Sequence, residues 1–159
     1  MQSPPLIQDG LAYIPGYGRL YAFDARSGKE QWTYEDHGGV ASLAADADSF
    51  YYETCDPGGP EAMGPCYLVA LSKQNQQVRW KLKTVSHFSI PIVRDGVIYL
   101  AAFHGTIYAL DAATGAVKWQ YVTGDSISAA LTLADETLFV GNWWAGTLYA
   151  IPVDGPARR

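Results

Sequence analysis

The segment Leu20-Tyr21-Ala22-Phe23-Asp24 is the first copy of a unit that recurs along this chain of 159 residues. The later copies are Leu68-Val69-Ala70-Leu71-Ser72, Ile107-Tyr108-Ala109-Leu110-Asp111 and Leu148-Tyr149-Ala150-Ile151-Pro152. Their alanines are 48, 39 and 41 residues apart. A period of this size is the signature of a repeat architecture, so it decides the fold before any local assignment does.

A tryptophan follows eight residues after the end of the first three copies, as Trp32, Trp80 and Trp119. The fourth copy has no such tryptophan. The second period is longer because it contains a Pro/Gly-rich stretch between Cys55 and Cys66. We therefore interpret that stretch as a loop inserted into an otherwise regular unit.

Within each unit, runs of about five apolar or alternating residues are separated by turn signals, a pattern typical of strands. In the third unit the runs end at Asp95-Gly96, His104-Gly105, Thr114-Gly115 and Gly124. Each complete unit is thus predicted to be four antiparallel strands. Pro5 and Pro91 fall in the first strand, which favours an edge position because proline lacks an N–H for the ladder. For Asp24 and Asp111 we predict a turn-forming role.

The pattern Ala-x-Asp-x-x-Thr/Ser-Gly-x-x-x-Trp spans Ala22 to Trp32 and Ala109 to Trp119, and it is degenerate from Ala70 to Trp80. It resembles the tryptophan-docking repeat of the quinoprotein-type (PQQ-like) β-propeller family. The resemblance implies an all-β fold, a β-propeller-type array of four antiparallel four-stranded blades whose last blade lacks its fourth strand. The family closes rings of about seven or eight blades. We therefore expect a partial ring or half of a dimeric ring.

We expect one propeller-repeat domain over residues 1–159, with its blades at about 1–36, 37–84, 85–124 and 125–159. The second blade contains the cysteine loop, residues 55–66. The resemblance also implies that three tryptophans dock neighbouring blades against one another: Trp32, Trp80 and Trp119.

Composition excludes several classes of protein. The chain has 16 acidic and 11 basic residues and a formal charge of −5, which repels phosphate backbones, so we expect no nucleic-acid partner. No run of about eighteen apolar residues occurs, so we expect no membrane insertion. Cys55 and Cys66 are predicted to form a disulfide, the alternative being two free thiols in a cytosolic protein. We expect a periplasmic or extracellular location, although residues 1–5 lack the pattern of a signal peptide.

In a four-stranded meander, the turn between the second and third strands and the connection to the next blade lie on one face, which we call the loop face. Function concentrates on loops held by a rigid scaffold. We predict a ligand- or partner-binding surface there, formed by Tyr17, His37, His87, Phe88, His104, Trp143 and Trp144. For Trp143-Trp144 the alternative is local packing. The three histidines lie on separate connections, so we expect no metal site.

These features favour a non-catalytic scaffold for a protein or small-molecule ligand, with no cofactor and no catalytic residues. A homodimer would complete the ring. The alternative from another class is a fragment of a quinoprotein alcohol or sugar dehydrogenase, which would need PQQ with calcium. The resemblance implies a disulfide of adjacent cysteines at the quinone in the alcohol enzymes, whereas Cys55 and Cys66 are eleven positions apart. A third interpretation is a sensor domain of a bacterial receptor kinase.

Overall fold

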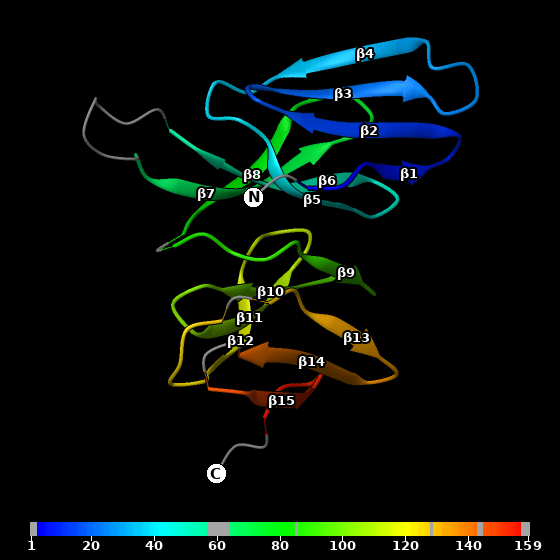
Figure 1. The fold of residues 1–159 in the computed structure, drawn as a ribbon. Helices are drawn as coiled ribbons and strands as arrows, with labels where there is room; N and C mark the ends of the chain where they lie inside the picture. Colours follow the sequence, from blue (N-terminus) through cyan, green and yellow to red (C-terminus); the bar gives the residue numbers. More distant parts are fainter. Residues whose placement is uncertain (1–2, 57–63, 85, 128, 143–144, 157–159) are drawn as a thin grey trace. The chain divides into compact units, whose positions relative to one another are not determined.

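A computed structural model describes residues 3–56, 64–84, 86–127, 129–142 and 145–156. The strands form four separate antiparallel sheets, each a meander in which strands adjacent in sequence pair with one another (Figure 1). The residue contacts divide the chain into two compact units, residues 1–85 and residues 86–159. Each unit contains two sheets.

The first unit contains sheets 1 and 2. Sheet 1 has the order β1-β2-β3-β4 and sheet 2 the order β5-β6-β7-β8. The strands of sheet 1 are β1 (Leu6–Gln8), β2 (Leu11–Gly16), β3 (Arg19–Asp24) and β4 (Glu30–Glu35). The strands of sheet 2 are β5 (Ala41–Ala45), β6 (Ser49–Cys55), β7 (Cys66–Ser72) and β8 (Val78–Thr84).

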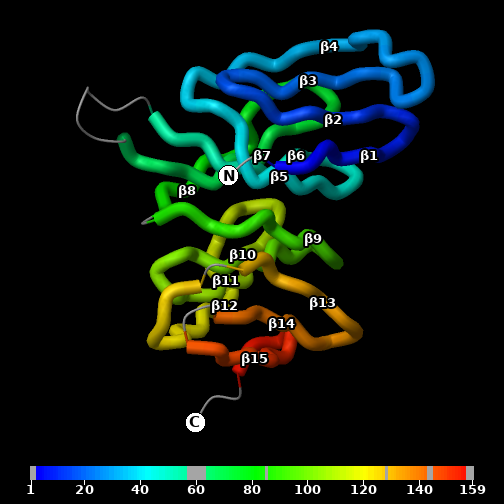
Figure 2. Tube along the Cα trace, viewed as in Figure 1, coloured from blue at the N-terminus to red at the C-terminus, as the bar shows by residue number. Residues whose placement is uncertain are grey.

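The second unit contains sheets 3 and 4. Sheet 3 consists of β9 (Ile92–Arg94), β10 (Val97–Ala102), β11 (Thr106–Asp111) and β12 (Val117–Val122). Among the described residues, sheet 4 has three strands, β13 (Thr132–Ala134), β14 (Thr137–Asn142) and β15 (Thr147–Pro152). The trace in Figure 2 shows the same up-and-down path in each sheet. The predicted array of antiparallel blades, the last one lacking its fourth strand, is therefore confirmed.

The first strand of each sheet is an edge strand, as expected. The expectation that Pro5 and Pro91 lie inside those strands is wrong. β1 begins at Leu6 and β9 at Ile92, each one residue after the proline. Proline has no N–H to donate, so the paired segment begins with the residue that follows it.

The turn residues do what their types predict. Asp9 and Gly10 have φ of 51° and 78°, and Asp95 and Gly96 have φ of 50° and 72°. Two successive residues with positive φ are the backbone of the tightest hairpins, which Asp-Gly pairs favour. The carboxylate of Asp24 accepts from the backbone N–H of Ser27 at 2.7 Å and from its hydroxyl at 2.6 Å. Asp111 accepts from Thr114 in the same way, so the predicted turn role of both aspartates is confirmed.

Each unit has its own core between its two sheets. In the first, Leu20 and Ala22 from β3 pack with Phe50, Val69 and Leu71 of sheet 2, all essentially inaccessible to solvent. The second repeats the arrangement, with a core formed by Ile107, Ala109, Leu138, Val140 and Ile151. The small alanine of the repeat lets a tryptophan lie across from it, as in the pairs Ala22–Trp32 and Ala109–Trp119.

Trp32 and Trp119 each contact an aromatic ring of their own sheet, and each also contacts a residue of the next sheet or of the segment that follows it. The Trp32 ring centroid lies 5.9 Å from that of Tyr13 and 6.0 Å from that of Phe50 in sheet 2. Trp119 lies 6.1 Å from Tyr99, and its Nε1–H donates to the carbonyl oxygen of Val153 at 2.9 Å. The role of the tryptophans in holding blades together stays a prediction, and these contacts are what it rests on.

Candidate functional site

The loop face of the first unit carries the most exposed aromatic side chain among the described residues. Tyr17, in the β2–β3 turn, is fully exposed (102 %). It lines a shallow depression of about 380 Å³ together with Gly18, Arg19, Tyr21, Glu35 and His37. The structure thus brings together two residues of the predicted binding surface, Tyr17 from β2–β3 and His37 from the β4–β5 connection.

Backbone hydrogen bonds fix these two loops relative to each other. The N–H of Asp36 donates to the carbonyl oxygen of Gly18 at 2.9 Å, and that of Val40 donates to Gly16 at 3.3 Å. Arg19 and Glu35 form an ion pair at 2.9 Å across the neighbouring strand pair. Tyr17 therefore projects from a loop whose base is held at several points.

Asp36 hydrogen-bonds to several groups of this region, and no sequence pattern predicted this role. Its carboxylate accepts from the hydroxyls of Tyr52 (2.8 Å) and Thr54 (2.6 Å) on β6, and from the backbone N–H of Gly38 (2.9 Å). Burial, and then the nearby carboxylate of Asp36, raises the pKa of Tyr52 well above its ordinary value. Tyr52 therefore stays a neutral donor that ties the β4–β5 connection to sheet 2.

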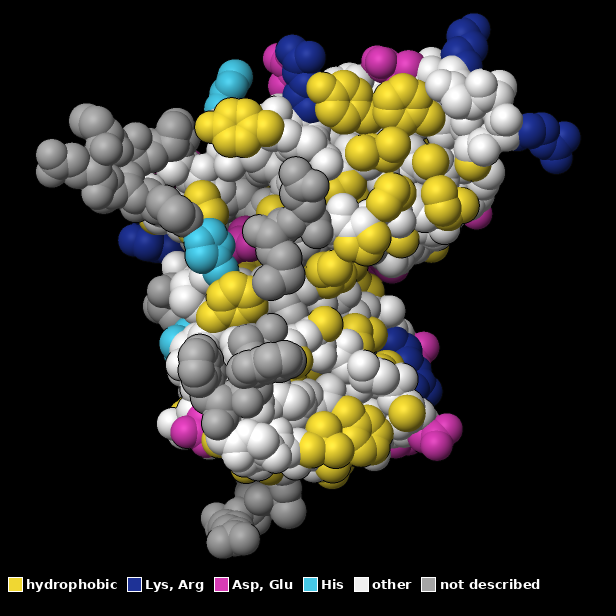
Figure 3. Space-filling view, in the orientation of Figure 1, with side chains coloured by type: hydrophobic (Ala, Val, Ile, Leu, Met, Phe, Trp, Pro, Cys, Tyr) yellow, Lys and Arg dark blue, Asp and Glu magenta, His cyan; other side chains and the backbone are white. Residues whose placement is uncertain are grey.

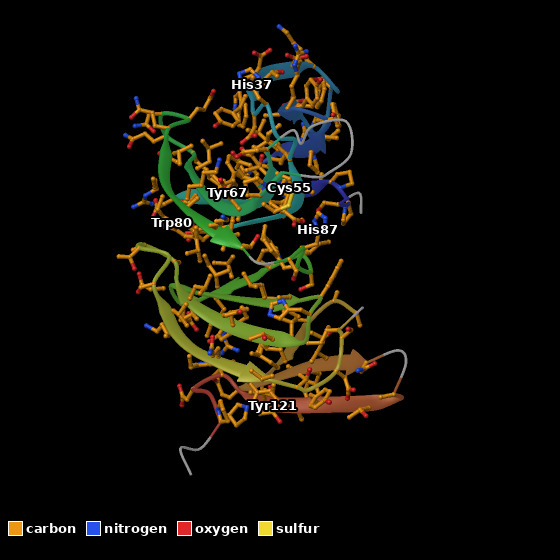
Figure 4. The ribbon with its side chains drawn as sticks, turned by 90° about the vertical axis from the view of Figure 1, so that its left-hand side faces the viewer. His37, Cys55, Tyr67, Trp80, His87 and Tyr121 are labelled. Atoms are coloured by element: carbon orange, nitrogen blue, oxygen red, sulfur yellow. A yellow bond between two sulfur atoms is a disulfide. The ribbon has the colours of Figure 1, made fainter. Side chains whose placement is uncertain are left out.

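The predicted disulfide between Cys55 and Cys66 is present, at the end of the β6–β7 hairpin (Figure 4). The two cysteines are direct cross-strand partners. The backbone N–H of Cys55 also donates to the carbonyl oxygen of Gly38 at 3.3 Å, so the hairpin end is attached to the β4–β5 connection. Beside it, the Lys81 ammonium lies 3.8 Å from the Tyr67 ring centroid. The disulfide therefore closes the base of the inserted loop.

The second unit repeats the bracing of the loop face with other side chains. The N–H of Thr123 donates to the carbonyl oxygen of Gly105 at 2.8 Å, the counterpart of the bond between Asp36 and Gly18. Thr123 also accepts a hydrogen bond from a tyrosine: the Tyr149 hydroxyl donates to its carbonyl oxygen at 3.1 Å. The cross-strand pairs Tyr52–Val69 and Val140–Tyr149 are equivalent in the two sheets. The tyrosine is on the second strand of sheet 2 but on the third strand of sheet 4. The equivalence of Tyr52 and Tyr149 becomes visible only when the pairing register of the strands is known.

His104 occupies the turn position that Tyr17 has in the first unit. Its Nδ1 lies 2.9 Å from the hydroxyl of Ser86, which also lies 3.0 Å from the carbonyl oxygen of His87. The Ser86 hydroxyl donates to the carbonyl oxygen and contacts the imidazole as well, so it joins the two loop segments. The rings of His87 and Phe103 are 6.4 Å apart. His87 and His104 thus belong to one cluster of loop side chains.

Phe88 differs from the other predicted surface residues. It is 2 % exposed and forms a bridge with Ala102. A ring buried to this degree has no surface to offer a ligand, so we exclude it from the loop-face surface. Trp143 and Trp144 lie outside the described residues. The remaining residues stay a predicted binding surface: Tyr17, His37, His87 and His104.

The described part of the chain contains no helix long and apolar enough to cross a membrane.

Repeated four-stranded meanders with an alanine opposite a tryptophan define the chain as a β-propeller module. The family model described as outer membrane protein assembly factor BamB matches residues 1–82 and 64–155. The chain belongs to this family of PQQ-like β-propellers.

Its relatives serve different purposes. The serine/threonine-protein kinase AfsK of Streptomyces griseus is 30 % identical over 159 residues, which cover 92 % of this chain and 18 % of the kinase. The quinoprotein alcohol dehydrogenase PedH of Pseudomonas putida is 34 % identical over 92 residues, 54 % of this chain and 15 % of the enzyme. The chain thus spans less than a fifth of either relative.

The fold also matches a solved structure. The crystal structure of BamB from Moraxella catarrhalis superimposes with a TM-score of 0.74 and 24 % identity, covering 96 % of this chain and 47 % of that one. At this identity the likeness concerns the fold alone. The four sheets correspond to about half of the BamB propeller.

Proposed function

We propose that the chain is a non-catalytic binding module, in which a rigid PQQ-like propeller array presents its loop face to a protein partner or ligand. The observation that carries the proposal is Tyr17, a fully exposed aromatic side chain on a loop held by Asp36 and Gly18. Tyrosine offers a large contact area with little loss of rotamer freedom and is enriched among the residues that dominate interface energies. The similarity to an assembly factor, BamB, supports a scaffolding role.

A binding experiment tests the loop face. The chain is immobilised, exposed to an extracytoplasmic extract of its source organism, and the retained proteins are quantified by mass spectrometry. We expect a retained partner that is lost with Tyr17→Ser and kept with Lys29→Ser, an exposed residue of the β3–β4 turn on the opposite face. A retained set that is the same for both variants, or no retained protein, would contradict the proposal.

A second experiment separates this function from that of a quinoprotein dehydrogenase, the class of PedH. The chain is incubated with PQQ and calcium and desalted. We expect its absorption spectrum to show no quinone band and an added alcohol to reduce no electron-accepting dye. A quinone band that survives desalting would favour the dehydrogenase.

The partners include, in this proposal, a second copy of the same chain. Sheet 1 exposes apolar residues on the side away from sheet 2, including Ile7 (63 %) and Ile14 (37 %) and the stacked rings of Tyr21 and Phe23. Figure 3 shows hydrophobic side chains gathered over this sheet. Sheet 4 exposes Leu148 (68 %) and, beside it, Ala150, on the side away from sheet 3.

The open face of sheet 4 corresponds to the face of sheet 1 that packs against sheet 2 inside the first unit. Leu20 and Ala22, equivalent to Leu148 and Ala150, are buried against the neighbouring sheet. The open face of sheet 4 in one copy would therefore pack against that of sheet 1 in another, and two copies would supply eight sheets. Buried apolar area is the main source of free energy for such an association.

A sensor role is the second candidate, because the similarity to the kinase AfsK covers 92 % of the chain. The complete reading frame of the gene tests it. A kinase catalytic domain in the same polypeptide would favour the sensor role, and a complete frame without one would remove it.

We also propose that the protein works in the periplasm or outside the cell. The Cys55–Cys66 disulfide supports this because such bonds persist in oxidising compartments. Labelling of thiols in intact cells with a membrane-impermeant reagent, before and after reduction, tests it. We expect labelling only after reduction.

A further inference from the structure

The end of the β6–β7 hairpin places three side chains of metal-ligating types close together in sheet 2. Cys55 and Cys66 are direct cross-strand partners whose Cα atoms are 3.9 Å apart. Glu53 lies two residues before Cys55 on β6, and residues two apart in a strand point to the same face of the sheet. One carboxylate oxygen of Glu53 and the two sulfur atoms all lie within 4.8 Å of one another. A single hairpin thus gathers two sulfur atoms and one oxygen atom.

The three side chains differ in their exposure to water. Glu53 is 5 % exposed and Cys66 is 8 % exposed, whereas Cys55 is partly exposed. A carboxylate removed from water to this degree is stable when it is hydrogen-bonded, paired with a cation or bound to a metal. The partial exposure of Cys55 gives a reductant or an ion access to the sulfur atoms. The cluster is therefore largely enclosed but still reachable from the solvent.

Two thiolates and a carboxylate form a ligand set that suits zinc. Zinc binds cysteine sulfur at about 2.3 Å and carboxylate oxygen at about 2.0–2.2 Å, with tetrahedral geometry. Two sulfur atoms on one tetrahedral zinc ion are about 3.8 Å apart, so breaking the S–S bond and rotating the two side chains opens the space that the ion needs. Soft thiolate ligands also select zinc over magnesium and calcium.

We propose that this hairpin end has two forms: a disulfide when oxidised, and a zinc site of Glu53, Cys55 and Cys66 when reduced. A dithiol reductant gives two electrons and two protons to the S–S bond, becomes a disulfide itself, and leaves both cysteines as thiols. Zinc then displaces one proton from each thiol and binds the two thiolates and the Glu53 carboxylate. Water fills the fourth position. In both forms the base of the inserted loop stays closed, either by the S–S bond or by the metal.

Cobalt(II) tests the site directly because it takes the place of zinc and is coloured. The full chain is reduced with a phosphine, which is not a thiol and does not compete for the metal, and is titrated with Co²⁺ in the absence of oxygen. We expect a thiolate-to-cobalt charge-transfer band and the intense visible bands of tetrahedral cobalt, reaching a limit at about one ion per chain. Added zinc should remove these bands, and the oxidised chain should not show them. A reduced chain without a charge-transfer band would overturn the proposal.

Glu53→Gln tests the third ligand, and Asp56→Asn is the matched control. Asp56 follows Cys55 directly, but its carboxylate lies 3.7 Å from the Lys81 ammonium. We expect Glu53→Gln to weaken zinc binding by the reduced chain at least about tenfold, and Asp56→Asn to change it by less than about twofold. Competition with a chromophoric chelator measures both affinities. Equal affinities of the two variants would overturn the three-ligand site.

A stability measurement on the parent chain decides the case in which Glu53→Gln does not fold, which circular dichroism checks. Zinc should raise the urea midpoint of the reduced parent chain, because it binds the folded hairpin and not the unfolded one to the same extent. The midpoints of the oxidised chain and of the reduced double variant, Cys55→Ser with Cys66→Ser, should not change. A zinc effect of equal size in the oxidised chain, or none in the reduced parent chain, would overturn the proposal.

Discussion

Gly38 is needed for the space it leaves and not for an unusual backbone conformation. A Cβ added there would lie 2.3 Å from the hydroxyl oxygen of Thr54 and 2.4 Å from the carbonyl oxygen of Cys55. Its φ is not in the left-handed region. The β4–β5 connection therefore packs directly on the end of β6, and this close approach brings Asp36 within reach of Tyr52 and Thr54.

Gly38→Ala should lower the free energy of unfolding by about 1–3 kcal/mol, because the methyl group forces the connection away from β6. Gly141→Ala is the matched control, since nothing lies within 4 Å of a Cβ at that strand position and its φ is also not left-handed. We expect the control to change stability by no more than about 0.5 kcal/mol. Urea unfolding followed by tryptophan fluorescence measures both. Equal effects at the two positions would contradict the packing argument.

The carboxyl groups of Asp24 and Asp111 should make the free energy of unfolding depend on pH. The pKa of Asp24 is lowered first by its hydrogen bond from the Ser27 side chain, and that of Asp111 by its bond from Thr114. A carboxyl group whose pKa is lower in the folded chain stabilises the fold above its unfolded pKa, and this contribution disappears as the pH falls through the folded value. The effect should therefore be present at neutral pH and absent in strong acid.

Replacing both residues, as Asp24→Asn and Asp111→Asn, should lower the melting temperature at about pH 7 and have a smaller effect at about pH 3. The neutral amide accepts the turn hydrogen bonds without a charge, so it loses the charge-assisted part of them. Thermal unfolding followed by circular dichroism at both pH values checks this. A deficit of the same size at both would show that the charge is irrelevant.

Some residue roles could be predicted from the sequence, and others could not. Asp24, Asp111 and the cysteine pair lie in local patterns whose chemistry is complete within a few residues, so they could be identified in advance. Asp36 could not, because its partners Tyr52 and Thr54 are 16 and 18 positions away. Phe88 was misplaced because its burial depends on tertiary packing and not on its position after a strand.

Among the elements, the β6–β7 hairpin combines two kinds of attachment. Its strands pair from Ser49–Ser72 to Cys55–Cys66, and the disulfide closes the end that leads into the inserted loop. The loop adds length to the second repeat without changing the register of the strands. The insertion was predictable from the period, whereas the bond from Cys55 to Gly38 needed the three-dimensional structure.

Cys55→Ser combined with Cys66→Ser should lower the free energy of unfolding by about 2–4 kcal/mol, because the open loop restores conformational freedom to the unfolded chain. Urea unfolding of the parent chain with and without a reductant gives an independent measure of the same effect. The reductant should not affect the double variant. An unchanged midpoint in the double variant would contradict a stabilising role.

The Trp119 side chain joins β12 to the residue that follows β15 in sheet 4. Trp119 packs on Tyr99, and its Nε1–H donates to Val153. Trp119→Phe should cost about 1 kcal/mol for the lost hydrogen bond, and Trp119→Ala about 3 kcal/mol for the lost packing. Chemical unfolding measures both. Equal costs would show that the indole N–H matters and the ring does not, contrary to this account.

Over the whole molecule, the repeat predicted the number of sheets and the missing fourth strand, because both follow from counting copies of one unit. It did not predict how apolar the terminal sheets would be on their open sides. That property depends on which residues of each strand face outward, and a shift of one residue in the register would reverse it. The exposed Ile7 and Leu148 are thus a result of the structure.

We propose that a second copy covers the open faces of sheets 1 and 4, which carry the exposed Ile7 and Leu148. Light scattering behind size exclusion measures the absolute mass in dilute solution. The account predicts a dimer with twice the 17.3 kDa of one chain, which Leu148→Lys combined with Ile7→Lys converts to a folded monomer. A parent chain that runs as a 17.3 kDa monomer at every concentration, or a dimer that the two lysines leave intact, would contradict it.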